Sequence, residues 1–331
     1  MELEEFLEQW HNDQPTIEVQ TSGSTGRPKK MLVEKRRMEA SARITCHFLG
    51  LNEGDTALLC LPLDYIAGKM MVVRALTCGL RLCSVEPSLH PLSTTPSALS
   101  PKLASIALAA MVPLQVWHTL QVPAERERLR QVRHLIIGGG AIDESMEREL
   151  QDFPHAVWST YGMTETLSHI ALRRLNGPDR SLYYTPFDGV GVRLSDDGCL
   201  VIDAPAVCSQ ALTTNDRAEL APDGRRFRIL GRKDNVVCSG GLKMQIEEIE
   251  RKLRRHIGVP FLITKRRDAA LGEAVVMLIE DGDTGRYASL CRDILPKHER
   301  PKTIIAVEHL PMTATGKPAR SRAEQLANAA D

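Results

Sequence analysis

Long apolar runs are missing from this sequence of 331 residues. A membrane-spanning helix needs about 20 consecutive apolar residues. The nearest approach, 70–80, is interrupted by Arg74. The first residues are acidic and lack the basic region and apolar run of a signal peptide. We therefore predict a cytoplasmic protein without a membrane span.

An excess of either charge is also missing. The 42 lysines and arginines balance 42 aspartates and glutamates, so the formal net charge is zero. Bulk electrostatics therefore gives no support for a nucleic-acid or membrane-surface partner. The hydrophobic content of 43% and the charged content of 25% are typical of a globular protein, and the length suits two domains.

Paired cysteines are the third absence. None of the eight cysteines belongs to a Cys-x-x-Cys pair or stands at ligand spacing from a histidine. Their neighbours are apolar, as around Cys60 and Cys238. This pattern predicts buried free thiols in a reducing compartment rather than a metal site or disulfides.

A loop rich in glycine and hydroxyl residues is present near the start of the chain. Residues 21–29 read Thr-Ser-Gly-Ser-Thr-Gly-Arg-Pro-Lys, between strand-like segments at 16–20 and 30–33. Glycines let the backbone approach an anion, and hydroxyls donate to it. The loop does not have the spacing of a Walker A motif. From these residues alone, a phosphate-binding loop and an ordinary surface hairpin stay equally open.

Strands and helices alternate in the first half of the chain, which predicts an α/β fold with parallel strands. Ligands of such sheets bind at the carboxyl ends of the strands, where 138–140 and 161–166 fall. Short strands after residue 200 suggest a small β subdomain, and the last 100 or so residues suggest a small α+β domain. The expected strands are 57–61, 81–85, 134–137 and 157–159, and the expected helices are 34–49, 69–80, 102–112 and 144–151.

Six groups of motifs, in this order, resemble those of the AMP-forming acyl-CoA synthetases, the ANL adenylate-forming family. They are 21–29, 138–141 (Gly-Gly-Gly-Ala), 161–165 (Tyr-Gly-Met-Thr-Glu), 214–216 (Thr-Asn-Asp), 231–234 (Gly-Arg-Lys-Asp) with 240–241 and 247–250, and 311–317 (Pro-Met-Thr-Ala-Thr-Gly-Lys). The resemblance implies an N-terminal adenylating domain, 1–231, with parallel-rich sheets, helices and a small β subdomain. It also implies a small mobile C-terminal α+β lid domain, 232–331, which rotates about Asp234.

The resemblance also implies a reaction. A small-molecule carboxylic acid attacks ATP to give acyl-AMP and pyrophosphate, and the thiol of CoA then displaces AMP. The implied cofactors are ATP, Mg²⁺ and CoA. Positioning and charge stabilisation dominate such phosphate chemistry.

The motifs assign roles by resemblance. The phosphate loop holds the β and γ phosphates with Thr21, Ser22, Gly23, Ser24, Thr25, Gly26 and Lys29. Gly139, Gly140 and Ala141 lie along the adenine, and Tyr161, followed by Gly162, stacks on it. Thr164 binds the α-phosphate and Glu165 binds Mg²⁺. Asp216 and Arg232 hold the ribose, Lys317 stabilises the transition state, and Gly240 and Gly241 admit the CoA arm.

Each of these residues also has an ordinary interpretation. Tyr161 could be a strand-end aromatic, Glu165 a surface or capping carboxylate, and Lys317 a solvated loop lysine. Asp216 could be a turn residue, because Asn215 stands where the family usually has glycine. Asparagine tolerates the positive φ that glycine would supply.

One departure is large, because only 20 residues precede the phosphate loop, where the family usually has many more. The first subdomain is therefore expected to be truncated. Within the family, 61–68 (Leu-Pro-Leu-Asp-Tyr-Ile-Ala-Gly) resembles a segment of the o-succinylbenzoate–CoA ligases of menaquinone synthesis, with Asp64 and Tyr65 replacing Phe-His. A ligase for another aryl or fatty acid and a non-catalytic nucleotide-binding protein stay open as alternatives.

The substrate of that group is a dianion, so its second carboxylate needs a cation or hydrogen-bond donors. The candidates are Lys69, Arg74, Ser168 and His169. Lys69 and Arg74 could instead be solvated helix residues, and His169 could be a packed histidine.

Overall fold

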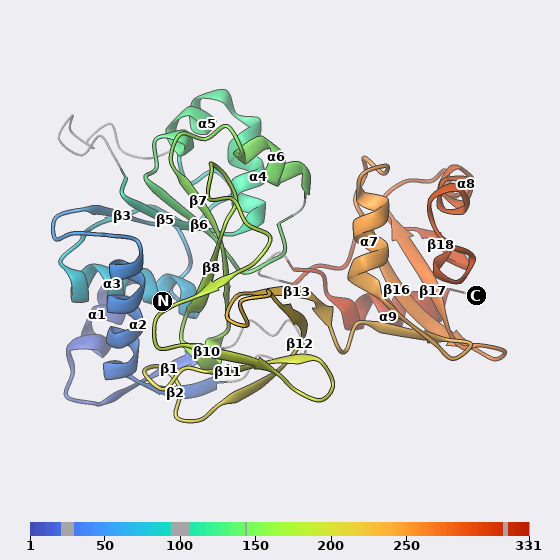
Figure 1. Ribbon diagram of the computed structural model, residues 1–331. Coiled ribbons are helices and arrows are strands. Elements are labelled where there is room, and N and C mark those ends of the chain that lie inside the picture. Colours follow the sequence, from blue (N-terminus) through green and yellow to red (C-terminus); the bar gives the residue numbers. More distant parts are fainter. Residues whose placement is uncertain (21–29, 94–105, 143, 314–316, 331) are drawn as a thin grey trace.

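The computed structural model describes residues 1–20, 30–93, 106–142, 144–313 and 317–330 (Figure 1). The predicted phosphate loop, 21–29, lies outside these residues.

A seven-stranded sheet forms the centre of the larger part of the molecule. Four of its strand pairs are parallel, as predicted, and the last two pairs are antiparallel. In spatial order the strands are β4 (Arg81–Ser84), β3 (Thr56–Leu59), β5 (Leu108–Met111), β6 (His134–Ile137), β7 (Ala156–Gly162), β8 (His169–Arg174) and β9 (Thr185–Pro186). The predicted α/β class is therefore confirmed.

Helices cover both faces of this sheet. Successive side chains of a strand point to opposite faces, and the apolar side chains on each face need cover from water. On one face, Leu59 packs with α1 (Leu3–His11), α2 (Lys35–Phe48) and α3 (Ile66–Cys78). On the other face, Leu58 packs with α4 (Pro113–Gln121), α5 (Pro123–Arg130) and α6 (Glu144–Leu150). Figure 1 shows these two groups of helices on opposite sides of the strands. Strands buried on both faces read as continuous apolar runs, which is what the sequence has.

The predicted helix at 102–112 is wrong in the part that the structure describes. Residues Leu108–Met111 form β5, every residue of which is buried. A short apolar run does not distinguish a strand from a buried helix by its period alone. The helices come afterwards, and α4 and α5 begin at Pro113 and Pro123, where proline is favoured because its missing N–H needs no partner.

Two smaller sheets complete this part. The hairpin of β1 (Thr16–Gln20) and β2 (Lys30–Glu34) pairs Gln20 with Lys30, the two residues that flank the 21–29 segment. The second sheet is antiparallel and consists of β10 (Gly191–Leu194), β11 (Cys199–Asp203), β12 (Leu212–Leu220) and β13 (Phe227–Arg232).

A five-stranded sheet with its own helices follows β13 and lies to the right in Figure 1. Its buried apolar residues run from Val237 to Ala327, whereas those of the larger part run from Phe6 to Phe227. The strands are β14 (Val236–Ser239), β15 (Leu242–Gln245), β16 (Phe261–Asp268), β17 (Gly272–Ile279) and β18 (Thr303–Ala306), and the helices are α7 (Ile246–Arg254), α8 (Thr284–Ile294) and α9 (Arg320–Ala329).

Within the described residues, no helix is both long and apolar enough to cross a membrane. The eight cysteines are free thiols, and five of them are buried. The expectation of burial is wrong for Cys238, which is exposed on β14, and Cys78 and Cys83 are half-buried.

Candidate active site

Two glycine-containing segments meet at the carboxyl ends of β6 and β7. The strands are parallel neighbours, so Gly138 and Gly162 leave the sheet on the same side. A Cβ on Gly138 would lie 2.3 Å from Thr160 Oγ1, and Gly139 has a φ of 80°. Glycine is therefore required here for a close approach and for a left-handed backbone. Gly140 and Ala141 follow in an exposed position from which a flat ligand could be contacted.

Tyr161, Asp216 and Arg232 form one hydrogen-bonded group. The Tyr161 hydroxyl donates to Asp216 Oδ2 at 2.7 Å, and Arg232 Nη1 donates to Asp216 Oδ1 at 3.3 Å. Strands β12 and β13 pair Asp216 with Arg232 directly. Burial and the adjacent Asp216 carboxylate raise the pKa of Tyr161, so its hydroxyl stays a donor at neutral pH. Three predicted nucleotide-binding residues are thus brought together from distant parts of the chain.

Lys317, in the smaller part of the molecule, lies within range of the charges of this group. Burial lowers the pKa of its amine, the charge of Arg232 lowers it further, and the charge of Asp216 opposes both. The amine therefore lies close enough to Arg232 and Asp216 to interact with their charges. The half-buried position differs from that of a fully solvated loop lysine.

The turn after β7 holds Thr164 and Glu165. It is a 3₁₀ turn, Thr164–Thr166, in which Thr164 is buried and Glu165 is exposed. The Thr166 hydroxyl accepts from Met163 N at 3.0 Å and lies 2.7 Å from the Ser168 carbonyl oxygen, which fixes the turn. The described residues contain no group of three His, Cys, Asp or Glu side chains that could hold a metal. A single exposed carboxylate still suits Mg²⁺, which commonly binds one or two carboxylates together with substrate phosphates.

A buried polar chain runs from α3 to α2. Arg74 Nη2 donates to Ser168 Oγ at 2.5 Å, and Ser168 Oγ lies 3.3 Å from His169 Nδ1. His169 Nε2 lies 3.1 Å from Thr45 Oγ1, which donates to the Ser41 carbonyl at 3.1 Å. Because Thr45 donates to Ser41, it accepts from His169 Nε2–H, and His169 Nδ1 then accepts from Ser168.

This chain requires a neutral histidine. Burial lowers the pKa of His169 well below its ordinary value, and the charge of Arg74 adds to the effect. The two interpretations of His169, a packed histidine and a pocket residue, are therefore compatible. His169 is fully hydrogen-bonded, and it also orients Ser168.

Arg74 is a buried cation with no carboxylate beside it. Its side chain is 2% exposed, and none of the described carboxylates lies within ion-pair distance. Its Nε has no hydrogen-bond partner, and burial lowers the pKa of the guanidinium to about 10. An uncompensated buried charge is costly, so the surroundings favour a bound anion.

Lys69 does not join this group, although it also lies on α3. Its amine is 3.2 Å from Met1 Sδ and 5.4 Å from the centre of the Phe6 ring. The alternative that Lys69 and Arg74 are solvated helix residues is wrong, because each is 2% exposed.

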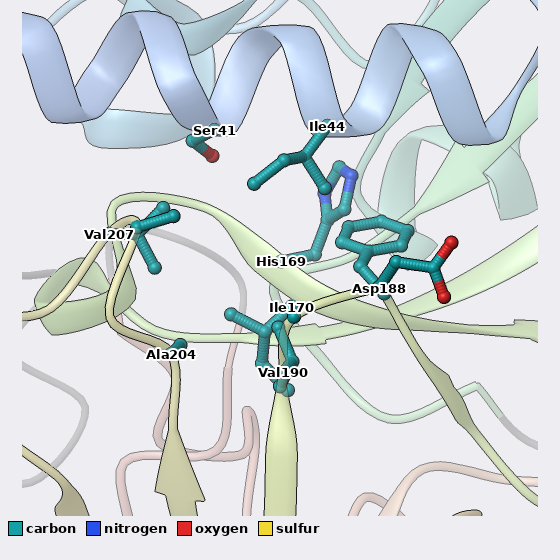
Figure 2. Close-up of a pocket in the computed structure, with 11 residues that line it drawn as sticks. Ser41, Ile44, His169, Ile170, Asp188, Val190, Ala204 and Val207 are labelled. Atoms are coloured by element: carbon teal, nitrogen blue, oxygen red, sulfur yellow. The ribbon is translucent and has the colours of Figure 1, made fainter.

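A small cavity lies on the α2 side of His169 (Figure 2). Its volume is about 20 Å³, which is enough for one water molecule. Figure 2 shows the His169 ring pointing toward Ile44 of α2, with Val190 and Val207 on the opposite wall. The cavity is too small for an organic acid, so it is not the acid-binding site.

Thr45 and Ser41 are the functional candidates that sequence reasoning missed. Both lie on the buried face of α2, where Thr45 is the polar member of an apolar stripe that includes Met38 and Ala42. A polar side chain on such a stripe is the pattern that could have identified them, because buried hydroxyls are hydrogen-bonded.

The remaining predicted residues, Asp234, Gly240 and Gly241, follow β13 along the chain. Asp234 Oδ2 accepts from Arg232 Nη2 at 2.9 Å and from Asn215 Nδ2 at 3.4 Å. Gly240 and Gly241, with φ of 56° and 84°, form the turn between β14 and β15. Among the described residues, no hydrogen bond joins this turn to the Tyr161–Asp216 group.

An α/β sheet with glycine-containing strand exits, a tyrosine–aspartate–arginine group and an approaching lysine defines a nucleotide-binding enzyme of the adenylating type. Residues 4–205 match the sequence model of the family described as AMP-binding enzyme. The chain belongs to this family, and the resemblance predicted from the motifs is confirmed.

Individual relatives agree with the family. The chain is 25% identical to a 2-succinylbenzoate–CoA ligase of Listeria innocua over 96% of this chain and 71% of the relative. It is 33% identical to the solved acyl-CoA synthetase (AMP-forming)/AMP-acid ligase II-like protein of Dyadobacter fermentans, with a TM-score of 0.64 over 98% of this chain and 92% of that one. The O-succinylbenzoate coenzyme A synthetase of Bacillus subtilis, solved with ATP and magnesium, shares the fold at 20% identity and a TM-score of 0.74, over 92% of this chain and 69% of that one.

Proposed function

We propose that this protein is an ATP-dependent acid–CoA ligase that converts 2-succinylbenzoate (o-succinylbenzoate) to its CoA thioester through acyl-AMP, as in menaquinone synthesis. The observation that carries the choice of acid is the buried Arg74, which lacks a carboxylate partner beside Ser168. The name of the relative that matches 96% of this chain supports the same acid. Because ATP and CoA are the co-substrates and the thiols are free, we place the protein in the cytoplasm.

The nucleotide site is proposed at the carboxyl ends of β6 and β7. Gly139, Gly140 and Ala141 would lie along the adenine, and Tyr161 would stack on it beside Gly162. The Asp216 carboxylate can accept from both ribose hydroxyls, and its bonds to Tyr161 and Arg232 already fix its orientation. The 21–29 segment would hold the β and γ phosphates between the paired ends of β1 and β2.

The charge of the reacting phosphate is proposed to be offset by three groups of this chain. The Thr164 hydroxyl would donate to the α-phosphate, and the Lys317 ammonium would lie against the oxygens that gain charge. Glu165 would hold Mg²⁺, which supplies further neutralisation of phosphate charge when it is bound.

The acid is proposed to bind with its unreacted carboxylate at Arg74. A guanidinium N–H that lacks a partner is satisfied by a carboxylate, and a charge-assisted bond is stronger in a buried site than in water. Ser168 would orient Arg74 toward the acid. The Ser168 hydroxyl donates a hydrogen bond to His169, so the serine oxygen is left to accept one from Arg74. Lys69 has less support, since Met1 and Phe6 cover its amine.

The thioester step is proposed to use a rotation of the smaller part. Residues 1–231 and 232–331 would be the two domains, and Asp234 would be the hinge. Separate apolar clusters on either side of β13 support this division. The charges of Arg232 and Asp216 act on the Lys317 amine in the present arrangement, which supports its use in the first half-reaction. Rotation would replace it with the Gly240 and Gly241 turn and admit CoA.

The test is ATP–pyrophosphate exchange with o-succinylbenzoate, benzoate and a fatty acid. We expect exchange with o-succinylbenzoate and a KM for this acid that rises roughly 30-fold in Arg74→Met, because a buried charged hydrogen bond is lost, while the KM for ATP is unchanged. Exchange with the fatty acid alone would contradict o-succinylbenzoate as the substrate but would still identify an adenylating enzyme. ATP binding without exchange on any acid would favour a non-catalytic nucleotide-binding protein.

A further inference from the structure

A buried ion pair follows Lys317 by three residues. Arg320, the first residue of α9, donates from Nη1 to Glu250 Oε1 at 2.7 Å and from Nη2 to Glu250 Oε2 at 2.9 Å. Glu250 lies on α7 and is 3% exposed. Two parallel bonds between a guanidinium and a carboxylate fix both distance and orientation, which a lysine cannot do.

The same pair closes the edge of the small sheet. Strand β16 pairs only with β17 among the described strands, so one side of it has no strand neighbour. There Ile263 N donates to Glu250 Oε1 at 2.9 Å, and the Ile263 carbonyl accepts from Arg320 Nη1 at 2.8 Å. Unpaired edge groups need partners when they are covered. The pair therefore ties α7, β16 and α9 into one unit.

Backbone bonds carry this constraint back to Lys317. The Lys317 carbonyl accepts from Thr313 N at 2.7 Å, and Lys317 N donates to Thr313 Oγ1 at 3.1 Å. Ala319 N donates to the Pro311 carbonyl at 2.8 Å. Three residues of chain span at most about 10 Å, so the place of Arg320 limits where Lys317 can stand.

We propose that Arg320 is a positioning residue for adenylation: its paired bonds to Glu250 tie the Lys317 segment, through α9, to α7 and β16 and so fix the place from which the Lys317 amine would act. This inference rests on the proposed function. Helix α7 also follows directly after β15 and the Gly240 and Gly241 turn. The pair therefore makes the Lys317 segment and that turn move as one body. When the rotation brings one of them to the nucleotide site, it moves the other away from it.

The variants are Arg320→Lys, which keeps the charge but not the paired geometry, and Arg320→Gln. Arg322→Gln on the exposed side of α9 is the matched control, since Arg322 bonds only Gln325 among the described side chains. Two half-reactions are measured on each full-length protein, with thermal unfolding to confirm folding. They are acid-dependent ATP–pyrophosphate exchange and thioester formation from supplied acyl-AMP and CoA.

We expect Arg320→Gln to lose about 100-fold in ATP–pyrophosphate exchange and less than about 3-fold in thioester formation, because a misplacement of about 1 Å can have an effect of that size. Arg320→Lys should fall between Arg320→Gln and the wild type, and Arg322→Gln should match the wild type. A purely structural role would lower both half-reactions equally, and that result, or unchanged exchange, would overturn the proposal.

Amide hydrogen exchange gives a readout that does not need turnover. We expect the amides of Thr313, Lys317 and Ala319 to exchange at least about 10-fold faster in Arg320→Gln, with β17 unchanged, because local opening is set by local bonds. If the wild type shows no adenylation of any acid, the proposed function fails. The exchange rates of these amides still test whether Arg320 holds the Lys317 segment in place. Wild-type protection of all three amides in Arg320→Gln would contradict it.

Discussion

At the scale of the residue, the chain from Arg74 to Thr45 links charge to protonation state. Arg74 needs an acceptor in Ser168, Ser168 needs one in His169, and His169 needs one in Thr45. Each side chain can satisfy its neighbour only if the imidazole stays neutral, because an imidazolium has no acceptor. Burial of His169 enforces that state by lowering its pKa, and the positive charge of Arg74 adds to the effect.

The free energy of unfolding should therefore fall in acid. The folded-state pKa of His169 is lower than the unfolded value of about 6.5, so between the two the unfolded chain holds more protons and stability rises with pH. The contribution is complete above about pH 7 and is lost as pH decreases, by at most about 1.4 kcal/mol per pH unit. Burial lowers the pKa of His134 to about 4, so it acts in the same direction.

Urea unfolding of wild type and His169→Asn between pH 5 and 7.5 measures this term. The variant should show a smaller loss of stability in acid, since it retains His134 but lacks the group that binds the extra proton on unfolding. His256→Asn, at an exposed position, is the control and should follow the wild type. Parallel curves for the wild type and His169→Asn would rule out a neutral, buried His169 as the source.

At the scale of the element, close backbone approach shapes the end of β7. The register of β7 on β8 shifts between Tyr161 and Gly162. A Cβ on Gly162 would lie 2.2 Å from the Ser168 carbonyl oxygen and 2.5 Å from His169 Cα. The backbone at Ser168 and His169, where β8 begins, therefore lies directly against Gly162, the residue after the tyrosine that would stack on adenine, and the two halves of the proposed site meet at one bulge.

Gly162→Ala should separate these halves. We expect a loss of about 1–3 kcal/mol in the free energy of unfolding, since the added methyl meets backbone that cannot rotate away. We also expect slower ATP–pyrophosphate exchange. Gly258→Ala, where nothing lies within 4 Å of the new methyl, should behave as the wild type in both assays. An unfolding midpoint for Gly162→Ala equal to the wild-type value would contradict this prediction, because β7 and β8 would then have moved apart without loss of stability.

The elements with strong local patterns could be predicted from sequence. The apolar strand β6 and the glycines after it were predicted because both features lie within a few residues of each other. Strand β5 was mistaken for part of a helix because burial on both faces removes the period-two pattern. The bond between Tyr161 and Asp216 spans 55 residues, so it depends on how β12 packs against β7, which no local pattern encodes.

At the scale of the whole molecule, an exposed ion pair joins the two parts in the present arrangement. Arg255, at the end of α7, lies 2.6 Å from Glu144 at the start of α6, although 111 residues separate them. Both side chains are substantially exposed, 61% and 44%. Such a pair contributes up to about 1 kcal/mol and weakens with salt. It would break if residues 232–331 rotated as proposed.

Arg255→Glu should therefore shift the balance away from adenylation. ATP–pyrophosphate exchange should fall by up to about 5-fold at low salt, the equivalent of about 1 kcal/mol, and the double variant Glu144→Arg/Arg255→Glu should recover most of it. Arg251→Glu on the same helix is the control for added negative charge. If the double variant does not recover exchange, or if Arg255→Glu has the same effect at low salt and at 0.5 M salt, the Arg255–Glu144 pair does not favour this arrangement.

The most direct measurement of the central claim is the two half-reactions of Lys317→Ala with o-succinylbenzoate. In the proposed mechanism Lys317 would touch the phosphate only in the arrangement used for adenylation, so ATP–pyrophosphate exchange should drop by at least about 100-fold, as when a charged group aimed at the transition state is removed. Thioester formation from supplied acyl-AMP and CoA should stay within about 3-fold of the wild type, because that step would use the Gly240 and Gly241 turn instead. Equal loss of both half-reactions would contradict a small domain that serves the two steps in turn.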